Sequence, residues 1–317
     1  MQKKYLEVIQ LQFKKISLLL ILTLALVGCA KNTENINKIN LSNTKQTEDI
    51  SKTNSNGNVD AKSTLKNNSD SKISSKSFSP IQLDNTSSLQ RKTINWSWAY
   101  SPRENAAVLS KYHAYAFGET SKKVIYLTFD EGYENGYTAS ILDTLKTNNV
   151  KAAFFVTQDY VTGSFNGKKN IDLVKRMMNE GHIIANHSVH HKSMPSITNE
   201  TTFNSEITEN ETTVNNITGL KMSKFFRPPM GDFSELSLYY TQKLGYKSIF
   251  FSLAYNDYDP KNQPDPETSK KNLLKGTKPG MICLLHAVSK TNAEILDSLI
   301  KEWVTQGYEF KTLNDLP

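Results

Sequence analysis

The chain has 317 residues, more than one compact domain usually needs, so part of it is expected to lie outside the folded domain. Its formal net charge is +7, but the lysine and arginine residues are scattered and are not interleaved with aromatic residues. This pattern argues against nucleic-acid binding and favours affinity for an anionic envelope polymer or a membrane surface.

The first 29 residues predict a lipoprotein-type signal segment. A lysine-containing lead precedes an apolar stretch at 16–27, which is too short for a membrane span. The stretch ends in Leu26-Val27-Gly28-Cys29, which resembles the bacterial lipoprotein signal, in which the cysteine is lipidated and becomes the first residue. An uncleaved N-terminal anchor is the alternative. Both interpretations predict an exported protein that is tethered to a membrane of the cell envelope.

Residues 30–93 predict a disordered linker. Asn, Ser, Thr, Lys and Asp dominate this stretch, and no aromatic residue occurs in it before Phe78. Such a composition buries too little apolar surface to offset the entropy of ordering the chain. A flexible coil of ~60 residues spans on the order of 40–45 Å, enough to hold a folded domain away from a membrane.

From residue 94 to residue 317, strand-like and helix-like segments alternate. We expect strands at 124–129, 152–157, 182–186, 225–226, 248–253, 281–285 and 308–312. We expect helices at 138–148, 171–180, 199–218, 235–244, 266–275 and 293–305. Apolar strands that alternate with helices predict a parallel sheet covered by helices. The predicted fold is therefore α/β, a distorted (β/α) barrel of about seven parallel strands, in which chemistry gathers at the C-terminal strand ends.

The side chains suited to catalysis follow these strand ends. Seven residues share this position: Asp130, Glu131, His187, His191, Arg227, Asp257 and His286. Two imidazoles four residues apart, together with a strand-end carboxylate, can bind a metal ion with one position left open for water. Alone, such a histidine pair is more often a pair of surface or core residues. With a second carboxylate available as a base, the whole pattern favours hydrolysis by a metal-activated water.

Five short motifs occur in order along residues 94–317: Thr128-Phe129-Asp130-Glu131-Gly132, His187-Ser188-x-x-His191, Arg227-Pro228-Pro229-Met230-Gly231, Asp257-Tyr258 and Leu284-Leu285-His286. They resemble the five motifs of the NodB-type polysaccharide deacetylases, carbohydrate esterase family 4. Longer strings around the first, second and fifth motifs are similar to the branch that deacetylates muramic acid in spore-cortex peptidoglycan.

The resemblance implies a metal site beside a catalytic base. Asp130 matches the base, and His187 and His191 match two metal ligands of the family. Glu131 stands at the third ligand position, where the family carries Asp, and the muramic-acid branch also departs from the Asp-Asp pattern there. His190, between the two ligands, is expected to be a bystander.

The other motif residues complete the implied site. Arg227 matches the arginine that orients the base, and the Met230 backbone N–H matches a donor that holds the oxyanion. His286 matches the general acid, and Asp257 matches the carboxylate that raises the pKa of that acid. Tyr258 stands where many members of the family carry Trp.

These roles imply a metal-dependent peptidoglycan N-deacetylase, with zinc as the expected metal. Its expected substrate is N-acetylmuramic acid, whose freed amine closes into muramic δ-lactam in the spore cortex. An N-acetylmuramoyl-L-alanine amidase must then remove the stem peptide first. Two alternatives remain open, a peptidoglycan or chitin-type N-acetylglucosamine deacetylase and a tethered glycan-binding pseudoenzyme. The expected partners are glycan strands and a membrane, and not nucleic acid.

Overall fold

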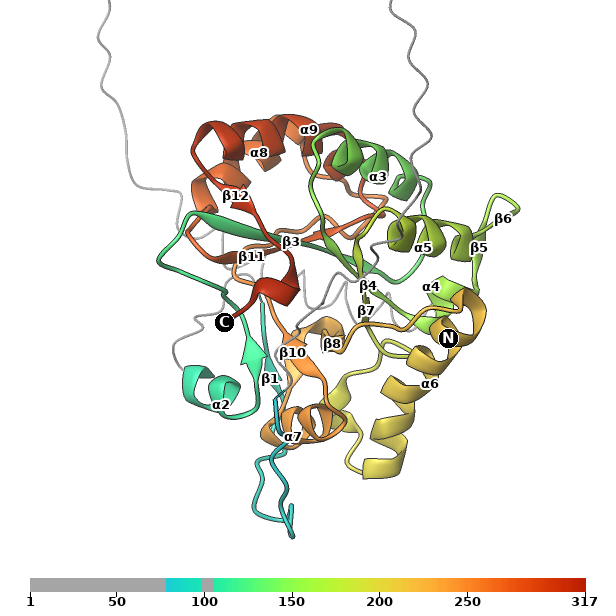
Figure 1. The fold of residues 1–317 in the computed structure, drawn as a ribbon, viewed down its shortest axis with the longest axis vertical. Helices are drawn as coiled ribbons and strands as arrows, with labels where there is room; N and C mark the ends of the chain where they lie inside the picture. The colour runs from blue at the N-terminus through green and yellow to red at the C-terminus, as the bar shows by residue number, and fades with distance from the viewer. Residues whose placement is uncertain (1–77, 98–104) are drawn as a thin grey trace, which may run out of the picture. The chain divides into compact units, whose positions relative to one another are not determined.

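Parallel strands and the helices that cover them dominate the structure (Figure 1), a computed structural model that describes residues 78–97 and 105–317. The predicted signal segment, and the predicted linker as far as residue 77, lie outside the described residues. Within the two described ranges, no helix combines the length and the apolar character that crossing a membrane requires.

Seven strands form one continuous path through the main sheet, and an eighth pairs with the second strand of that path. The path runs β11 (Met281–His286), β3 (Val124–Glu131), β4 (Ala153–Val156), β7 (Ile183–Asn186), β8 (Phe225–Phe226), β10 (Lys247–Ile249) and β2 (Ala114–Tyr115), and β12 (Glu309–Phe310) pairs with β3. Every ladder in this sheet is parallel. Isolated bridges at Phe117–Met281 and Leu253–Cys283 link the two ends of the path, so the sheet curls towards a barrel without a continuous closing ladder. The expected α/β fold with about seven parallel strands is confirmed.

Eight α-helices flank the sheet within the described residues. They are α2 (Ala106–Lys111), α3 (Thr138–Thr147), α4 (Gln158–Thr162), α5 (Asn170–Asn179), α6 (Glu200–Thr218), α7 (Glu235–Lys243), α8 (Pro266–Gly276) and α9 (Lys290–Thr305). In Figure 1, α3, α8 and α9 lie side by side above β3 and β11, and α9 contacts both of the other two helices.

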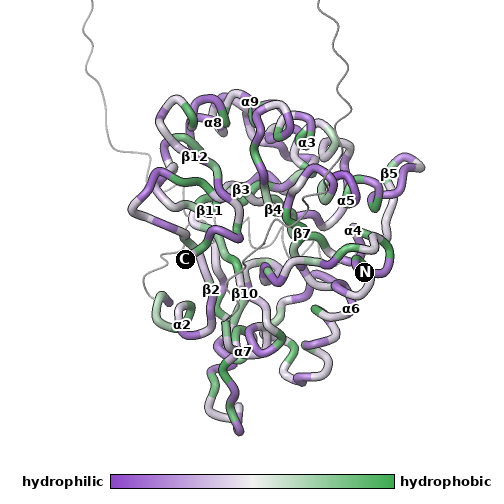
Figure 2. Tube along the Cα trace, in the orientation of Figure 1, coloured by the Kyte–Doolittle hydropathy of each residue, from purple (hydrophilic) through white to green (hydrophobic). Residues whose placement is uncertain are grey.

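Alternation along β3 separates two parts of the core. Ile125, Leu127 and Phe129 pack in the layer between the sheet and its helices, whereas Val124 and Tyr126 face the barrel interior. Successive side chains of a strand point to opposite faces of a sheet, so each strand contributes to both parts. The central strands are therefore hydrophobic, whereas the helices also carry hydrophilic segments (Figure 2).

Most predicted elements lie within two residues of their expected bounds. The strand expected at 248–253 is an exception, because β10 ends at Ile249 and the chain then crosses to β11. There the backbone N–H groups of Ser252 and Leu253 donate to the Ile282 carbonyl. Helix α9 begins at Lys290, three residues early, because the Ser289 side chain caps it. The short elements α2, β2 and α4, and the hairpin of β5 (Ser164–Phe165) and β6 (Lys168–Lys169), were not predicted.

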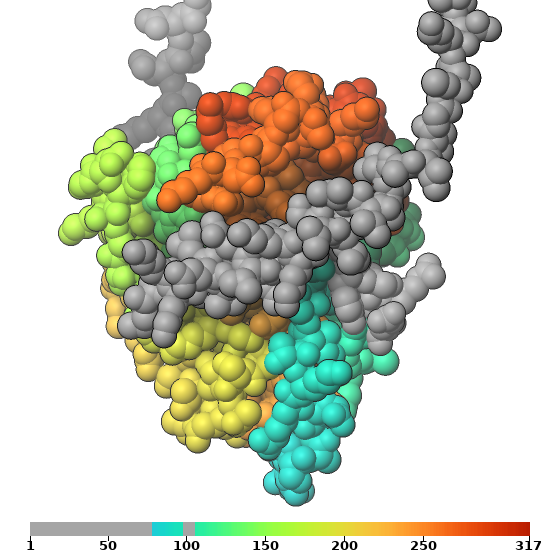
Figure 3. Space-filling model, turned by 180° about the vertical axis from the view of Figure 1, so that it is seen from behind, coloured from blue at the N-terminus to red at the C-terminus, as the bar shows by residue number. Residues whose placement is uncertain are grey.

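Residues 78–97, called the strap below, lie on the surface of the domain (Figure 3, cyan) and contact α7. The Ile81 N–H donates to Gln242 Oε1 at 2.7 Å, and Gln242 Nε2 donates to the Ile81 carbonyl at 2.8 Å. Leu89 is buried, and β1 (Ile94–Asn95) pairs with β9 (Asp232–Phe233). The predicted linker therefore ends too late at residue 93, because its last residues bind the domain through backbone hydrogen bonds that composition does not reveal.

Candidate active site

The C-terminal ends of four strands bring the candidate residues to one edge of the sheet. β3 and β11 pair in a register that sets Asp130 directly opposite His286. β7 and β8 lead into His187 and Arg227, and the Arg227 N–H donates to the Asn186 carbonyl at 3.0 Å. Six predicted site residues meet here: Asp130, His187, His191, Arg227, Asp257 and His286.

Asp130 and Arg227 form a buried ion pair. Arg227 Nη1 donates to Asp130 Oδ1 at 2.7 Å, and each residue is less than a tenth exposed. Burial alone would raise the pKa of the Asp130 carboxyl, but Arg227 and the neighbouring imidazoles more than offset it and hold that pKa below its usual value. Asp130 is therefore ionised and able to accept a proton.

Hydrogen bonds and a ring contact hold the Arg227 side chain in place. Its Nε donates to the Ile249 carbonyl at 3.1 Å, its Nη2 donates to Thr128 Oγ1 at 2.9 Å, and its guanidinium lies over the Phe155 ring. These contacts hold the guanidinium plane in place and satisfy donors that burial would otherwise leave without water.

His286 and Asp257 form the second charged pair. His286 Nδ1 lies 2.7 Å from Asp257 Oδ1, and the His286 backbone N–H donates to the other carboxylate oxygen at 2.8 Å. Burial would lower the pKa of the imidazole, but the Asp257 carboxylate outweighs burial and raises that pKa above its usual value. His286 is thus suited to carry a proton that it can donate.

His187 and His191 lie face to edge, with ring centroids 4.8 Å apart. His187 Nδ1 donates to the Arg227 carbonyl at 2.8 Å, since a carbonyl oxygen can only accept, and this leaves a lone pair on Nε2. Burial lowers the pKa of both imidazoles, that of His191 to about 3. Both rings are therefore neutral, as nitrogen ligands of a metal must be.

Glu131 does not join them, which corrects the predicted set of three ligands. Asp130 continues the interior face of β3, so Glu131 continues the opposite face, on which Phe129 packs beneath the helices. Its carboxylate is fully buried, and neither of its oxygens has a hydrogen-bond partner in the structure. Burial, together with the nearby carboxylates of Glu134 and Asp130, raises the pKa of Glu131 well above its usual value.

The residues present fit a metal ion only in part. His187 and His191 offer two neutral, buried imidazoles, and the fixed Nδ1 of His187 is typical of metal-binding histidines. Among residues 78–97 and 105–317, however, no group of three or more His, Cys, Asp or Glu side chains is arranged to hold a metal ion. The donor set that the structure supports is therefore the pair of imidazoles.

Met230 lies in a tight turn next to the site, with a backbone φ of +59°. The following residue, Gly231, also has positive φ, and a Cβ added there would lie 2.1 Å from the Trp96 carbonyl oxygen. The Trp96 N–H donates to the Gly231 carbonyl at 2.9 Å, and Trp96 Nε1 donates to the Phe251 carbonyl at 2.8 Å. Trp96, for which the sequence indicated no role, thus anchors the turn from the strap.

Three further residues support the site and were not predicted. The Thr128 hydroxyl accepts from Arg227 and donates to the Cys283 carbonyl at 2.7 Å. The sequence could have indicated this residue, because it lies two residues before Asp130 and therefore on the same face of the strand. Asn292 Nδ2 donates to Asp257 Oδ2, and no sequence pattern indicated it. Glu206 of α6 accepts hydrogen bonds from the loop that carries His191.

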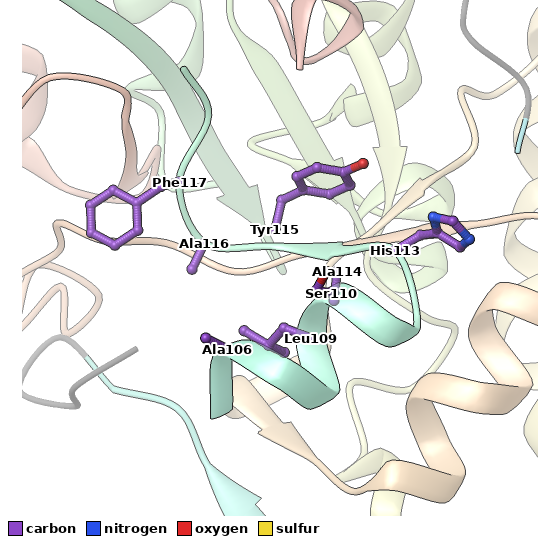
Figure 4. Close-up of a pocket in the computed structure, with 8 residues that line it drawn as sticks. All are labelled: Ala106, Leu109, Ser110, His113, Ala114, Tyr115, Ala116 and Phe117. Atoms are coloured by element: carbon purple, nitrogen blue, oxygen red, sulfur yellow. The ribbon is translucent and has the colours of Figure 1, made fainter. Parts of the chain in front are cut away.

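A cavity of about 260 Å³ lies between α2 and β2 (Figure 4). Small and apolar side chains dominate its lining, which comprises Ala106, Leu109, Ser110, His113, Ala114, Tyr115, Ala116 and Phe117. None of the predicted site residues lines it.

Comparisons with known proteins assign the family. A family model described as polysaccharide deacetylase matches residues 117–249. Peptidoglycan-N-acetylmuramic acid deacetylase PdaA of Bacillus subtilis is 40% identical over 239 residues, which cover 72% of this chain and 88% of PdaA. The chain belongs to the polysaccharide deacetylase family. The solved structure of PdaA, described as a family 4 carbohydrate esterase, matches with a TM-score of 0.67 over 71% of this chain and 97% of the PdaA chain.

Two other relatives of this deacetylase extend the comparison. An uncharacterised 30.6 kDa protein of Geobacillus stearothermophilus is 46% identical over 66% of this chain and 76% of its own length. A peptidoglycan-N-acetylglucosamine deacetylase of Bacillus cereus is 32% identical over 63% of this chain and 71% of its own length. The predicted family and hydrolase class are confirmed, since the named relatives are deacetylases of N-acetylated sugars, and removing an N-acetyl group hydrolyses an amide C–N bond.

Proposed function

We propose that the protein removes the acetyl group from N-acetylmuramic acid in peptidoglycan. One observation carries the proposal: an ionised carboxylate, Asp130, and a proton-bearing imidazole, His286, lie opposite each other on adjacent strands. Amide hydrolysis needs such a base and acid together. The similarity to PdaA supports the choice of sugar.

The two charged pairs divide the proton transfers between them. Asp130, held ionised by Arg227, takes a proton from the water that attacks the acetyl carbonyl. The backbone N–H of Met230 is proposed to stabilise the oxyanion, a role that places no demand on the methionine side chain. His286, held protonated by Asp257, then donates its proton to the departing nitrogen, so acetate and a free amine are released.

A divalent metal ion, for which we propose zinc, would be held by His187 and His191. When bound, it would polarise the acetyl carbonyl as a Lewis acid. In this chain the metal would have two protein ligands, not three, because Glu131 lies on the other face of β3.

The cellular role that we propose follows from the product. A free amine on muramic acid can close onto its own lactyl carboxyl once an amidase has removed the stem peptide, giving the muramic δ-lactam of spore cortex. Tethering through a lipid on Cys29 would keep the enzyme beside this polymer at the cell envelope.

The decisive experiment uses the purified protein and glycan strands from which an amidase has removed the peptides. Release of acetate, and formation of δ-lactam detected by mass spectrometry, are expected, and Asp130→Asn should lower the rate about 10²-fold or more. Metal content is measured on the same preparation.

The remaining outcomes separate the alternatives. Acetate release from N-acetylglucosamine oligomers alone would identify a glucosamine deacetylase, as the Bacillus cereus relative is named. Glycan binding with no acetate release from any strand would identify a pseudoenzyme.

A further inference from the structure

The loop that carries His191 has an unusual backbone. Ser188 and His191 have φ angles of +71° and +51°, in the left-handed region that residues other than glycine seldom adopt. Such conformations are strained and persist only where the surroundings hold them. Contacts from outside the loop must therefore stabilise residues 188–192.

Helix α6 supplies these contacts through Glu206, which is only 4% exposed. Its Oε2 accepts the His190 backbone N–H at 3.0 Å, and its Oε1 accepts His190 Nδ1 at 2.9 Å and Lys192 Nζ at 3.1 Å. Its backbone carbonyl accepts the Val189 N–H at 2.9 Å. One residue of α6 thus accepts hydrogen bonds from three residues of the loop, Val189, His190 and Lys192.

The other end of the loop is fixed separately. Asn186 Oδ1 accepts the Ser188 N–H at 2.9 Å, and Asn210 of α6 donates to the same oxygen at 3.1 Å. The His191 N–H donates to Ser188 Oγ at 3.0 Å, which is a contact within the loop. Within residues 189–192, the hydrogen bonds to groups outside the loop go to Glu206. The next fixed point along the chain is Ser193, which donates to Asp232 Oδ2 at 2.6 Å.

We propose that Glu206 is a positioning residue that holds residues 188–192 in this conformation and thereby sets the His191 imidazole against His187. His190 was expected to be a bystander, but Glu206 holds the loop through the backbone N–H and the imidazole of His190. The inference rests on the proposed function only in taking the two imidazoles as metal ligands.

The test compares two substitutions on the same helix in the full chain. Glu206→Ala removes the side-chain contacts to the loop. Glu211→Ala is the matched control, because Glu211 also accepts two hydrogen bonds, from Tyr246 and Lys224, and neither residue belongs to the loop. Zinc affinity is measured by competition with a chromophoric chelator, alongside thermal stability, kcat and KM.

Glu206→Ala is expected to bind zinc ~10–100-fold more weakly, the usual effect of losing a contact that orients a metal ligand. Glu211→Ala should bind zinc within about two-fold of the unchanged protein, although it also loses two side-chain hydrogen bonds. Glu206→Gln, which keeps the side-chain length and an acceptor for the His190 N–H, should lie between the two, and it carries the test if Glu206→Ala does not fold.

Crystal structures of the Glu206 variant and the unchanged protein provide a readout that is independent of metal and activity. A His191 φ that leaves the left-handed region in the variant supports the proposal, even if the protein proves not to bind zinc or not to deacetylate glycans. An unchanged His191 conformation with unchanged zinc affinity overturns it, as does an equal loss of zinc affinity in Glu211→Ala.

Discussion

At the scale of single residues, the burial of the Glu131 carboxyl group is energetically unfavourable. Its buried carboxylate has no hydrogen-bond partner, and its pKa is raised, so the folded protein binds this proton more tightly than the unfolded chain does. Stability should therefore fall as the pH rises above about 4.3, the value for an unfolded glutamate. We expect Glu131→Gln to remove this fall and to be more stable at neutral pH by ~1–3 kcal/mol.

Urea unfolding at pH 5 and pH 7.5 measures the effect, with Glu267→Gln on the exposed surface of α8 as the control. Because Glu131 lies apart from the two imidazoles, bound metal should also be retained in Glu131→Gln. Parallel pH dependences in variant and unchanged protein, or loss of the metal, would show that the carboxylate is not the buried, protonated group described above.

His286 allows a prediction of pH dependence at the same scale. Asp257 raises the pKa of this imidazole, and a general acid is lost as the pH rises through its pKa. Asp257→Asn removes the charge but keeps the shape, so the alkaline limb of the kcat profile should move to lower pH and kcat should fall about 10²-fold. Asp259→Asn, on the same loop, is the control. An alkaline limb that stays in place would exclude His286 as the acid.

At the scale of elements, the turn at Pro229–Gly231 depends on its contact with the strap. Gly231 and Gly219 both have positive φ, +70° and +72°, but a Cβ would meet the Trp96 carbonyl only at Gly231 and meets nothing within 4 Å at Gly219. Gly219→Ala should cost only about 1 kcal/mol of backbone strain and leave kcat unchanged. Gly231→Ala should cost several times more and lower kcat, because the Met230 backbone must move.

Unfolding free energies and kcat of the two glycine variants check this prediction. Equal losses of stability with no change in kcat for Gly231→Ala would mean that the position of the turn does not matter for catalysis.

The elements also show where sequence patterns stop being informative. The helices and the longer strands were predicted because apolar residues recur along most of them, and glycine or a capping residue marks several of the helix ends. β2, a strand of two residues, carries no period and was missed, whereas the two adjacent phenylalanines of β8 allowed a strand to be expected there. β10 was predicted too long because residues 250–253 are as apolar as a strand but leave its ladder to meet β11.

At the scale of the whole molecule, the sheet explains why much of the site was predictable. Parallel strands place their C-terminal ends at one edge, so chain order alone grouped Asp130, Arg227 and His286. The same alternation sends neighbouring residues to opposite faces, and it separates Glu131 from the site although Asp130 precedes it directly. Contacts between distant segments, such as Glu206 with the His191 loop, follow from packing and have no local signal.

The strap makes another contact between distant segments. From it we predict that one substitution changes the unfolding free energy in opposite directions with and without the strap. Gln242 of α7 is fully buried, and the backbone of Ile81 satisfies both ends of its amide. Leu89 of the strap is also buried. A chain that starts at residue 94 should therefore be less stable than one that starts at residue 78, by roughly 3 kcal/mol from one buried leucine and one amide left without partners.

Gln242→Leu distinguishes this contact from a general effect of shortening the chain. In residues 78–317, the substitution leaves the Ile81 N–H and carbonyl without hydrogen-bond partners and should destabilise the protein by ~1–3 kcal/mol. In residues 94–317, it removes an amide that has lost its partners and should stabilise what remains. Urea unfolding of the four proteins completes a double-mutant cycle. The same change in unfolding free energy in both backgrounds would mean that Gln242 does not hold the strap.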